Sequence, residues 1–485
     1  MIMSKGRLLL INPWIYDFAA FNLWVEPIGL LSIASILREY GYELDFIDCL
    51  DRYNPDLLKL QGLSAPKGNA YGTGKYHRET VESPEVVKHI PRHFCRYGVT
   101  PDIFESELDK CEKPDVVLVT SKMTYWYPGP HEVIRRIKRR YPDVPVVLGG
   151  TYASLCHKHA TEKSGADFVV KGEGEFPALK LVDGLTGNSS DYSQFPTHIN
   201  DYPFPAHDLI RKLDFAAVLT ARGCPMTCSY CAVRLVSPGF RQREPNQVVD
   251  ELQWCHDEFG TRNFAFYDDA LLLNAKKHIH KILDGVIERG LDFHFHTPNS
   301  MHAQVIDAQL AHKMYAAGFK TIRISLETSD VMRQKLTGRK VTNNGFTRAV
   351  ENLKTAGFTA EDIGVYLLMG LPGQPLDEVA ESIRFVHERG VQAKLAEFTP
   401  IPGTVEWERA GEVYGFDPDS DPLLHNNCVF SLEIGQNKLD EWNAVKRLAT
   451  EGNRHILQSL NAESAKKKLS PGVTRGQKQK EKTND

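Results

Sequence analysis

The sequence has 485 residues and no long uninterrupted hydrophobic run. The stretch FNLWVEPIGLLSIASIL at 21–37 contains Asn22, Glu26 and Pro27, so it fails as a membrane-spanning helix. No small-residue cleavage site follows the short apolar run near the start of the chain. We therefore expect a soluble protein that does not contact a membrane.

Cysteine is scarce, and most cysteines stand alone. Six of the nine are scattered singly through the chain: Cys49, Cys95, Cys111, Cys156, Cys255 and Cys428. A secreted disulfide framework is denser and paired, so this usage favours the reducing cytoplasm. Neither sign of charge is in large excess, because the chain has 58 Lys and Arg residues and 62 Asp and Glu residues, a net charge of −4. This balance argues against a nucleic-acid partner, although it leaves a local basic groove open.

The first 185 residues alternate strand patterns with helical patterns. The predicted strands are LLINPW (9–14), YELDFIDCL (42–50), DVVLVTS (115–121), VPVVLGG (144–150) and DFVVKGEGE (167–175). Such alternation is typical of a doubly wound, Rossmann-like parallel sheet, here over residues 1–185. The irregular stretch 52–104 is too long for an ordinary connection, and we interpret it as an elaboration over the binding edge of the sheet.

The second half repeats the alternation after a linker rich in Pro, Ser and Asn at 186–213. Six further strands are predicted: FAAVLTA (215–221), NFAFYDD (263–269), FHFHTP (293–298), TIRISLE (321–327), IGVYLLMG (363–370) and QAKLAEFTP (392–400). Six β/α units predict a partial (β/α)6 barrel of the TIM type over 214–405. We expect a C-terminal extension at 406–461 and a disordered, polar tail at 462–485.

The segment RGCPMTCSYC at 222–231 places Cys224, Cys228 and Cys231 in one loop. This loop follows the first predicted barrel strand, at the rim where barrel sites form. A structural zinc or a simple electron-transfer cluster normally takes four ligands. Cys255 and His256 are candidates for a fourth ligand, but they lie on a predicted helix well beyond the loop. Three cysteines on a 4Fe–4S cluster instead leave one iron open for a substrate.

With this loop the chain resembles the radical SAM superfamily, whose cluster loop has the same spacing and an aromatic residue, here Tyr230, before the last cysteine. The resemblance implies that the open iron of the cluster binds S-adenosylmethionine (SAM). It also implies reductive cleavage of SAM to a 5′-deoxyadenosyl radical, with an electron donor such as flavodoxin or ferredoxin.

The resemblance extends to the later strands and implies a SAM site. FAFYDDALL (264–272) supplies Asp268 and Asp269, TIRISLETSD (321–330) supplies Ser325 and Glu327, and LLMGLPGQP (367–375) supplies Gly370. With Tyr230, these are the residues that the resemblance assigns to SAM. Each also has a purely structural interpretation, as a helix cap, a rim ion pair or a turn.

The N-terminal half resembles the cobalamin-binding class of radical SAM proteins, on pieces such as PDVVLVTS and VPVVLGGTYASL. Candidate cobalamin-binding residues at the strand ends are Thr120, Ser121, Tyr125, Gly149 and Gly150. The glycines allow a large flat ligand to approach closely, although structural turns would also explain them. The motif Asp-x-His-x-x-Gly, which supplies a histidine to cobalt, is absent. The resemblance then implies that cobalamin binds base-off without a histidine ligand; the alternative is a degenerate domain that binds no corrinoid.

The leading hypothesis is a radical SAM enzyme that cleaves SAM and transfers a methyl group with cobalamin to an unknown small-molecule substrate. A radical SAM enzyme without corrinoid, for example in methylthio transfer or rearrangement, is the first alternative. The second is a sensor without catalytic activity that binds a metal or a corrinoid. The substrate cannot be predicted from the sequence.

Overall fold

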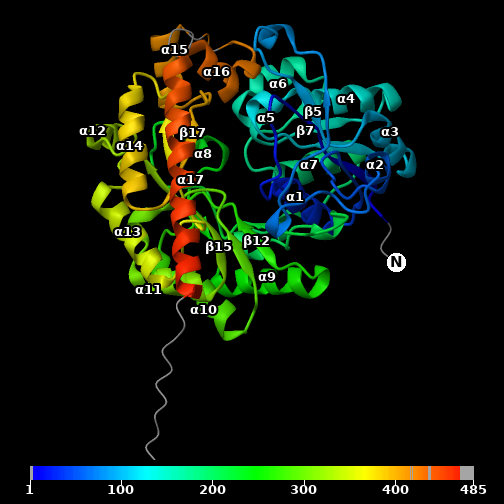
Figure 1. The fold of residues 1–485 in the computed structure, drawn as a ribbon. Helices are drawn as coiled ribbons and strands as arrows, with labels where there is room; N and C mark the ends of the chain where they lie inside the picture. The colour runs from blue at the N-terminus through cyan, green and yellow to red at the C-terminus, as the bar shows by residue number, and fades with distance from the viewer. Residues whose placement is uncertain (1–3, 416, 418, 435–438, 470–485) are drawn as a thin grey trace, which may run out of the picture.

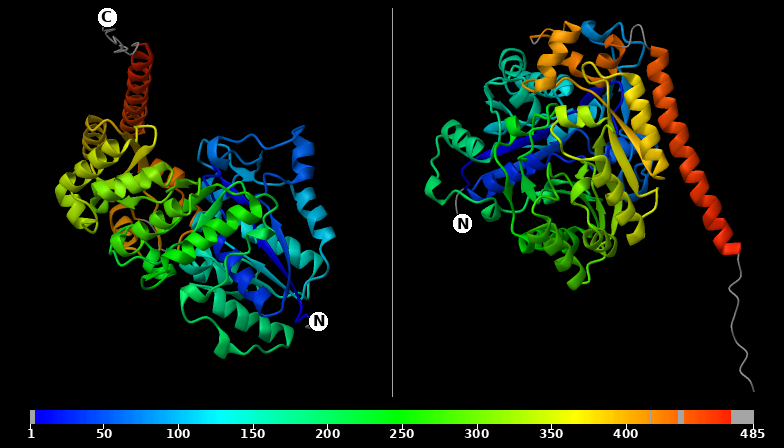
Figure 2. Two further views of the ribbon diagram at one scale, coloured as in Figure 1. Left: turned by 90° about the horizontal axis from the view of Figure 1, so that it is seen from below. Right: turned by 90° about the vertical axis from the view of Figure 1, so that its left-hand side faces the viewer.

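The computed structural model describes residues 4–415, 417, 419–434 and 439–469. The chain forms two α/β bodies that contact each other along one side, and a long C-terminal helix crosses the second body (Figure 1). Figure 2 shows the two bodies from two further directions, with the N-terminal body in blue and cyan and the second body in green and yellow. The predicted fold class is confirmed for both.

The N-terminal body is built on a five-stranded parallel sheet with the order β3-β1-β6-β7-β8. Its strands are β1 (Arg7–Asn12), β3 (Glu43–Asp48), β6 (Val116–Val119), β7 (Val146–Leu148) and β8 (Phe168–Val169). The helices are α1 (Ile28–Glu39), α3 (Pro101–Lys110), α4 (Pro128–Arg140), α5 (Thr151–Leu155), α6 (His157–Lys163) and α7 (Glu175–Thr186). The chain order reverses direction between β1 and β6, so the C-terminal edge there is a topological switch point.

Side-chain alternation explains why the sheet is covered on both faces. Leu9 and Ile11 pack with residues of α3, α4, α5 and α6, whereas Leu8 and Leu10 pack with α1 and α7. All four leucine and isoleucine side chains are fully buried. Successive strand residues point to opposite faces, so a continuous apolar run is the pattern of a strand with helices on both sides.

The expected elaboration contains regular structure. It holds α2 (Pro55–Gln61) and two strands, β4 (Arg78–Thr80) and β5 (Cys95–Tyr97), which form an antiparallel sheet with β2 (Ile15–Asp17). Its last residues, 101–104, are already the first turn of α3, because Thr100 caps this helix and Pro101 begins it. The elaboration also reaches the second body, where the Tyr71 ring contacts His296.

The second body is an open barrel whose strand order is β9-β12-β13-β15-β16-β17, all parallel. The strands are β9 (Ala216–Val218), β12 (Asn263–Phe266), β13 (His294–His296), β15 (Phe319–Glu327), β16 (Ile363–Met369) and β17 (Gln392–Glu397). A short strand, β14 (Met301–His302), also pairs with β15. The helices between them are α9 (Pro245–Phe259), α10 (Ile279–Glu288), α11 (Ala308–Ala316), α12 (Val331–Leu336), α13 (Asn343–Ala356) and α14 (Leu376–Glu388). The six expected β/α units are all present.

The segment between the two bodies packs against them. Residues 186–213 contain three short 3-10 turns, and Ile199, Ala206 and His207 are buried there. Pro and Asn in this segment therefore mark turns of a fixed connection.

The C-terminal extension consists of α15 (Val405–Tyr414), a 3-10 turn (Pro422–His425), α16 (Asn427–Ile434) and α17 (Leu439–Leu469). Trp442, Val445 and Ala449 of α17 belong to the barrel core. Asn453 accepts a hydrogen bond from the Ala393 N–H (2.8 Å) and donates one to the Ala393 carbonyl (2.7 Å), so α17 occupies the free edge of β17. The helix continues past residue 461, where we expected disorder to begin; Ala, Glu and Lys in this part are good helix formers. Residues 470–485 of the expected tail lie outside the described residues.

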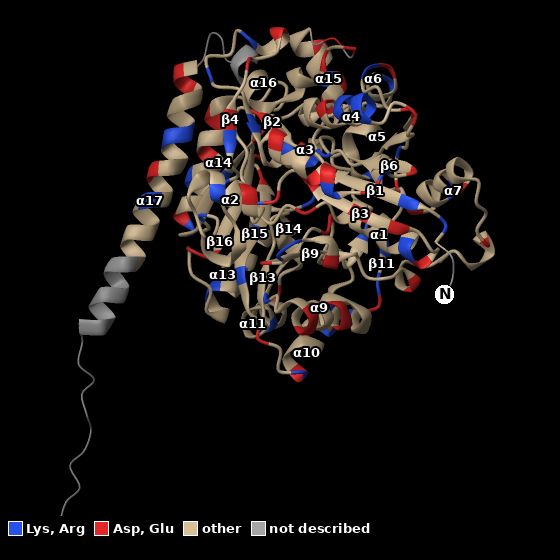
Figure 3. Ribbon diagram, turned by 90° about the vertical axis from the view of Figure 1, so that its right-hand side faces the viewer, with Lys and Arg blue, Asp and Glu red and all other residues tan. Residues whose placement is uncertain are grey.

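Within the described part of the chain, no helix combines the length and apolarity that a bilayer crossing requires. Figure 3 shows basic and acidic residues interspersed on the face it presents, as the nearly balanced net charge suggests.

Candidate functional site

The three-cysteine loop leaves the barrel through a short hairpin at the end of β9. Here β10 (Ala221–Arg222) pairs with β11 (Arg241–Gln242). Gly223 follows with φ = +75°, and a Cβ there would lie 1.9 Å from the Gly239 carbonyl oxygen. Only glycine fits this position, so the hairpin sets the direction in which the loop departs.

The thiols lie together at the C-terminal rim of the barrel. Cys224 and Cys228 are half-buried and Cys231 is exposed, and none forms a disulfide. The Cys231 N–H donates to the Cys228 carbonyl (3.2 Å), which closes a turn between the last two cysteines. Burial raises the pKa of Cys224 and Cys228, and the nearby Lys340 ammonium opposes this shift.

Among the described residues, no three His, Cys, Asp or Glu side chains surround a single-ion position. A cubane cluster needs no such convergence, because each thiolate binds a different iron. The donor set, three thiols from one loop beside a cation, fits a cluster with one open iron.

A second loop covers the cysteines. Gly338 has φ = +115°, and a Cβ there would lie 3.0 Å from the Cys228 Cα. Two residues later, Lys340 Nζ lies 3.4 Å from Glu327 Oε1 and 3.5 Å from Ser300 Oγ. Gly338 and Lys340 were not predicted from the sequence, because only the fold brings the segment after α12 back over the cysteine loop.

Glu327 ends β15 with φ = +67°, a conformation rare for residues other than glycine. Its side chain is only 9% exposed. Residues held in such conformations are concentrated at functional sites, where the surrounding structure maintains the strain. The strain and the Lys340 contact therefore single out Glu327 among the residues predicted for SAM.

The two consecutive aspartates have different surroundings. Asp268 is buried and accepts hydrogen bonds from the Thr220 N–H (3.1 Å) and the Thr220 hydroxyl (2.6 Å), so it anchors the turn between β9 and the cysteine loop. Burial raises its pKa to about 7. Asp269 lines a cavity beside the cysteines, and burial raises its pKa to about 6. Of the two, Asp269 is the one placed to contact a ligand.

The other predicted SAM residues form the wall around this rim. Ser325 is fully buried and donates to the Met301 carbonyl (3.3 Å). The Tyr230 ring packs with Leu368 and Leu371, and its hydroxyl is buried beside Glu327 and Cys228. Gly370 has φ = +90°, and a Cβ there would lie 2.5 Å from the Trp442 ring, so this glycine is required by packing.

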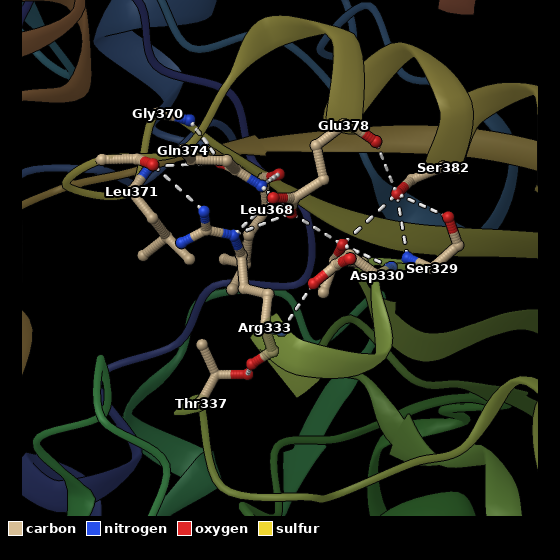
Figure 4. A network of polar contacts seen from close by, with 12 residues as sticks. Ser329, Asp330, Arg333, Thr337, Leu368, Gly370, Leu371, Gln374, Glu378 and Ser382 are labelled. Carbon is tan, nitrogen blue, oxygen red and sulfur yellow. Dashed lines mark hydrogen bonds and ion pairs between the residues drawn. The ribbon is translucent and has the colours of Figure 1, made fainter. Parts of the chain in front are cut away.

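A polar network fixes the ends of β15 and β16 relative to each other (Figure 4). Arg333 donates to both oxygens of Glu378 (2.8 and 2.7 Å) and to the Gly373 carbonyl (3.1 Å). Gln374 accepts from the Gly370 N–H (3.0 Å) and donates to Glu378 (3.2 Å). The network therefore holds the loop of Gly370 close to the strand end that carries Glu327. Arg333, Gln374 and Glu378 were not predicted from the sequence, because their pairing depends on contacts between separate elements.

A cavity of 260 Å³ lies where the two bodies meet. Thr120, Gly149 and Gly150 line it from the C-terminal edge of the N-terminal sheet, and Arg222, Gly223 and Asp269 line it from the barrel rim. Arg222 also pairs with the buried Glu175 of α7 at 2.5 Å, which connects the cysteine hairpin to the first body. The cavity thus joins the edge where we expect cobalamin to the rim that carries the cysteines.

The five residues predicted for cobalamin separate into two groups. Thr120, Gly149 and Gly150 line the cavity, whereas Ser121 and Tyr125 are not among the lining residues. The Ser121 hydroxyl donates to the Gly149 carbonyl (2.7 Å) and so fixes this loop. The Tyr125 ring contacts Trp126, which donates to Asp17 (2.7 Å), and this aromatic segment packs between the N-terminal body and the C-terminal extension.

Two further observations bear on whether a corrinoid fits. Gly149 has open space beyond its Cα, since an added Cβ would meet no protein atom closer than 3.9 Å. At the switch point of the sheet, Asn12 Oδ1 and Lys122 Nζ are buried without a hydrogen-bond partner among the described residues. Buried polar atoms are normally paired, so these atoms are available to a polar ligand. The sheet edge therefore fits a large ligand that carries amide groups.

Comparison with known proteins agrees with this arrangement. A family model described as the radical SAM superfamily matches residues 218–386, and one described as the B12 binding domain matches residues 94–181. The chain therefore carries a B12-binding domain ahead of a radical SAM domain.

The individual proteins that match the chain share less than 30% of its residues. An uncharacterized methyltransferase of Pyrococcus horikoshii, PH0819, is 27% identical over 344 residues, which cover 64% of this chain and 73% of that protein. Cytidylyl-2-hydroxyethylphosphonate methyltransferase of Streptomyces wedmorensis is 22% identical over 462 residues, 82% of this chain and 80% of that protein. The structure of the radical SAM methyltransferase TsrM from Kitasatospora setae, with cobalamin and a 4Fe–4S cluster bound, gives a TM-score of 0.62 at 17% identity. It covers 84% of this chain and 78% of that chain, and it shares the fold.

Proposed function

We propose that this chain is a cobalamin-dependent radical SAM methyltransferase that acts on a small molecule. The observation that carries the proposal is the cavity shared by the B12-binding sheet edge and the cysteine rim. When bound, the 4Fe–4S cluster supplies the electron that cleaves SAM, and cobalamin carries the methyl group. The names of the two relatives, both methyltransferases, support the reaction class.

In this proposal the protein residues hold and orient the reactants. Cys224, Cys228 and Cys231 bind three irons, and Lys340 offsets the negative charge of the thiolates. Asp269 and Glu327 face the SAM position from two different strands. The Arg222–Glu175 pair and the hydrogen bond from the Ala217 N–H to Glu26 (2.9 Å) keep the two bodies in contact.

We also propose the domain division 1–185, 186–213, 214–405, 406–461 and 462–485, with both family-model matches inside its first and third parts. The other six cysteines are scattered singly along the chain, so the sequence predicts no second iron–sulfur cluster. We therefore propose an external electron donor of the flavodoxin or ferredoxin type. The nine free cysteines support a cytoplasmic location.

The test is anaerobic reconstitution with iron, sulfide and hydroxocobalamin, followed by desalting and measurement of iron and cobalt per chain. We expect about one cluster and one cobalamin per chain. After addition of a low-potential chemical reductant, which converts the bound Co(III) to Co(I), we expect transfer of a labelled methyl group from SAM to the cobalamin. A full cluster without retained cobalt would contradict the proposal and favour radical chemistry that needs only SAM.

A glycine pair makes the corrinoid part of the test specific. In Gly149→Ala the added methyl group meets no protein atom closer than 3.9 Å but enters the cavity. We expect an unchanged melting temperature and cobalamin retention at least tenfold weaker. The control is Gly184→Ala on α7, where an added Cβ meets nothing within 4 Å and the residue does not line the cavity. Equal retention by both variants would remove the cavity from the cobalamin site.

A further inference from the structure

Two basic side chains face the inside of the barrel, Arg323 on β15 and Lys394 on β17. Their strand neighbours Ile322, Ile324 and Ala393 belong to the core beneath the helices. Because side chains alternate along a strand, Arg323 and Lys394 point to the opposite face, into the lumen. We call these two residues the lumen cation pair; their strands are labelled in Figure 1.

The register places the pair close to the site already described. Ser325 is paired with Tyr366, and Tyr366 with Lys394, so these three residues share one level of the barrel. Arg323 lies two residues below Ser325 and four below Glu327, which is about 7 Å and about 13 Å along the strand. The lumen cation pair therefore lies at and below the level of the predicted SAM residues.

Neither cation has a carboxylate partner among the described residues. Arg323 donates to the carbonyls of Ile322 (3.0 Å) and Asp362 (3.5 Å). Lys394 donates to the Gln392 side-chain oxygen at 2.9 Å. Burial lowers the pKa of both groups, and Arg323 lowers that of Lys394 further. Two like charges in a partly desolvated space without a counter-charge are costly.

The residues around the lumen cation pair include a glycine and a histidine with a ring nitrogen that is unpaired within the described part of the chain. A Cβ on Gly364 would lie 2.9 Å from Arg323 Nη1, so the guanidinium lies flat over a position without a side chain. His296 is fully buried, and its Nε2 has no partner among the described residues. Trp24 stacks on the His296 ring with the ring centroids 4.2 Å apart. Lys394 also borders a groove of 640 Å³ between β17 and α17.

We propose that the lumen cation pair binds an oxyanion, the phosphate, phosphonate or carboxylate group of the substrate. A guanidinium presents parallel N–H donors that match two oxygens of such a group, and the lysine adds a second positive charge. Tyr366 interacts with Arg323, but no described carboxylate offsets the repulsion between the two cations, and an anion between them does so. The proposal rests on the proposed function and deepens it, because it names the chemical class of the substrate.

The experiment measures anion binding without turnover. The reconstituted full-length protein is titrated with inorganic phosphate, methylphosphonate or acetate at constant ionic strength, with chloride as the balancing anion. Binding is followed by calorimetry and by the melting temperature. We expect saturable binding of at least one oxyanion by the wild type, and affinity at least tenfold weaker in Arg323→Gln and in Lys394→Met. Comparison of the three anions identifies which group is preferred.

The matched control is Arg262→Gln, because Arg262 is paired with Asp292 at the surface (3.0 Å) and should bind as the wild type does. If Arg323→Gln does not fold, Arg323→Lys and Lys394→Met take its place. Equal affinity in all variants, or no binding of any oxyanion by the wild type, would overturn the proposal. Iron, cobalt and SAM cleavage are measured on the same samples, so failure of the anion site is distinguished from failure of the methyltransferase proposal.

Discussion

At the scale of single residues, the cysteine loop depends on a few positions that accept only one kind of side chain. Gly223 and Gly338 allow backbones to approach where a Cβ would lie 1.9 Å and 3.0 Å from neighbouring main-chain atoms. Glu327 adopts a positive φ at the strand end beside Lys340. A strained backbone conformation of this kind costs stability, and proteins retain such conformations at functional sites.

The cysteines themselves give the clearest prediction at this scale. Cys228→Ala should abolish iron incorporation, because the thiolate is the iron ligand, and should leave the melting temperature nearly unchanged, because the thiol is only half-buried. Iron per chain after anaerobic reconstitution and a thermal melt provide the two measurements. Cys111→Ala, another half-buried cysteine, is the matched control and should incorporate iron normally. Normal iron content in Cys228→Ala would exclude the cysteine loop as the cluster site.

At the scale of elements, the barrel site is maintained by contacts between strand ends. The loop after β16 and the helix after β15 meet through Arg333, Glu378 and Gln374 (Figure 4). The Arg333 and Glu378 side chains are 15% and 13% exposed, so this is a largely buried charge pair. Its function is to place Glu327 and Gly370 on the same side of the rim.

Arg333→Met should therefore lower the free energy of unfolding by about 3 kcal/mol, because it leaves the Glu378 carboxylate buried without its partner. SAM affinity should fall several-fold, while iron content stays normal. Urea denaturation and equilibrium dialysis with labelled SAM measure the two effects. Arg262→Met, which breaks a surface pair with Asp292, should change stability by less than about 1 kcal/mol. If both variants were equally stable, the network would not be needed to hold the ends of β15 and β16 in place.

At the scale of the whole molecule, two bodies and one helix form the site together. The N-terminal body contributes one wall of the cavity and the barrel contributes the other. The helix α17 closes the free edge of β17 through Asn453 and adds Trp442 to the barrel core. An open barrel leaves an edge strand that needs such a cover.

Two truncations test the role of this helix. A chain ending at residue 460 keeps Trp442, Val445, Ala449 and Asn453, so its melting temperature and iron content should equal those of the full chain. A chain ending at residue 434 exposes the β17 edge and should aggregate. Size-exclusion chromatography and thermal melts distinguish the two. A lower melting temperature on removal of residues 461–485 alone would show that these residues contribute to stability.

Some of the site was predictable from the sequence because its signals are local. The spacing of Cys224, Cys228 and Cys231 and the order of strands and helices depend on residues close together in the chain, so periodicity and motif suffice for them. The glycines at 149 and 150 follow a predicted strand, which is enough to place them at a sheet edge.

Other features were decided only by the tertiary structure. Lys340 lies beside Glu327, Arg333 pairs with Glu378, and Arg323 lies near Lys394 with one strand between them, because strands and loops far apart in sequence pack together. The same packing separates Asp268, which anchors a turn, from Asp269, which faces the cavity. Sequence alone determined which chemical groups this protein carries and on which elements. Tertiary structure decided which of them meet, because burial and the neutralisation of charge depend on neighbours that local patterns do not specify.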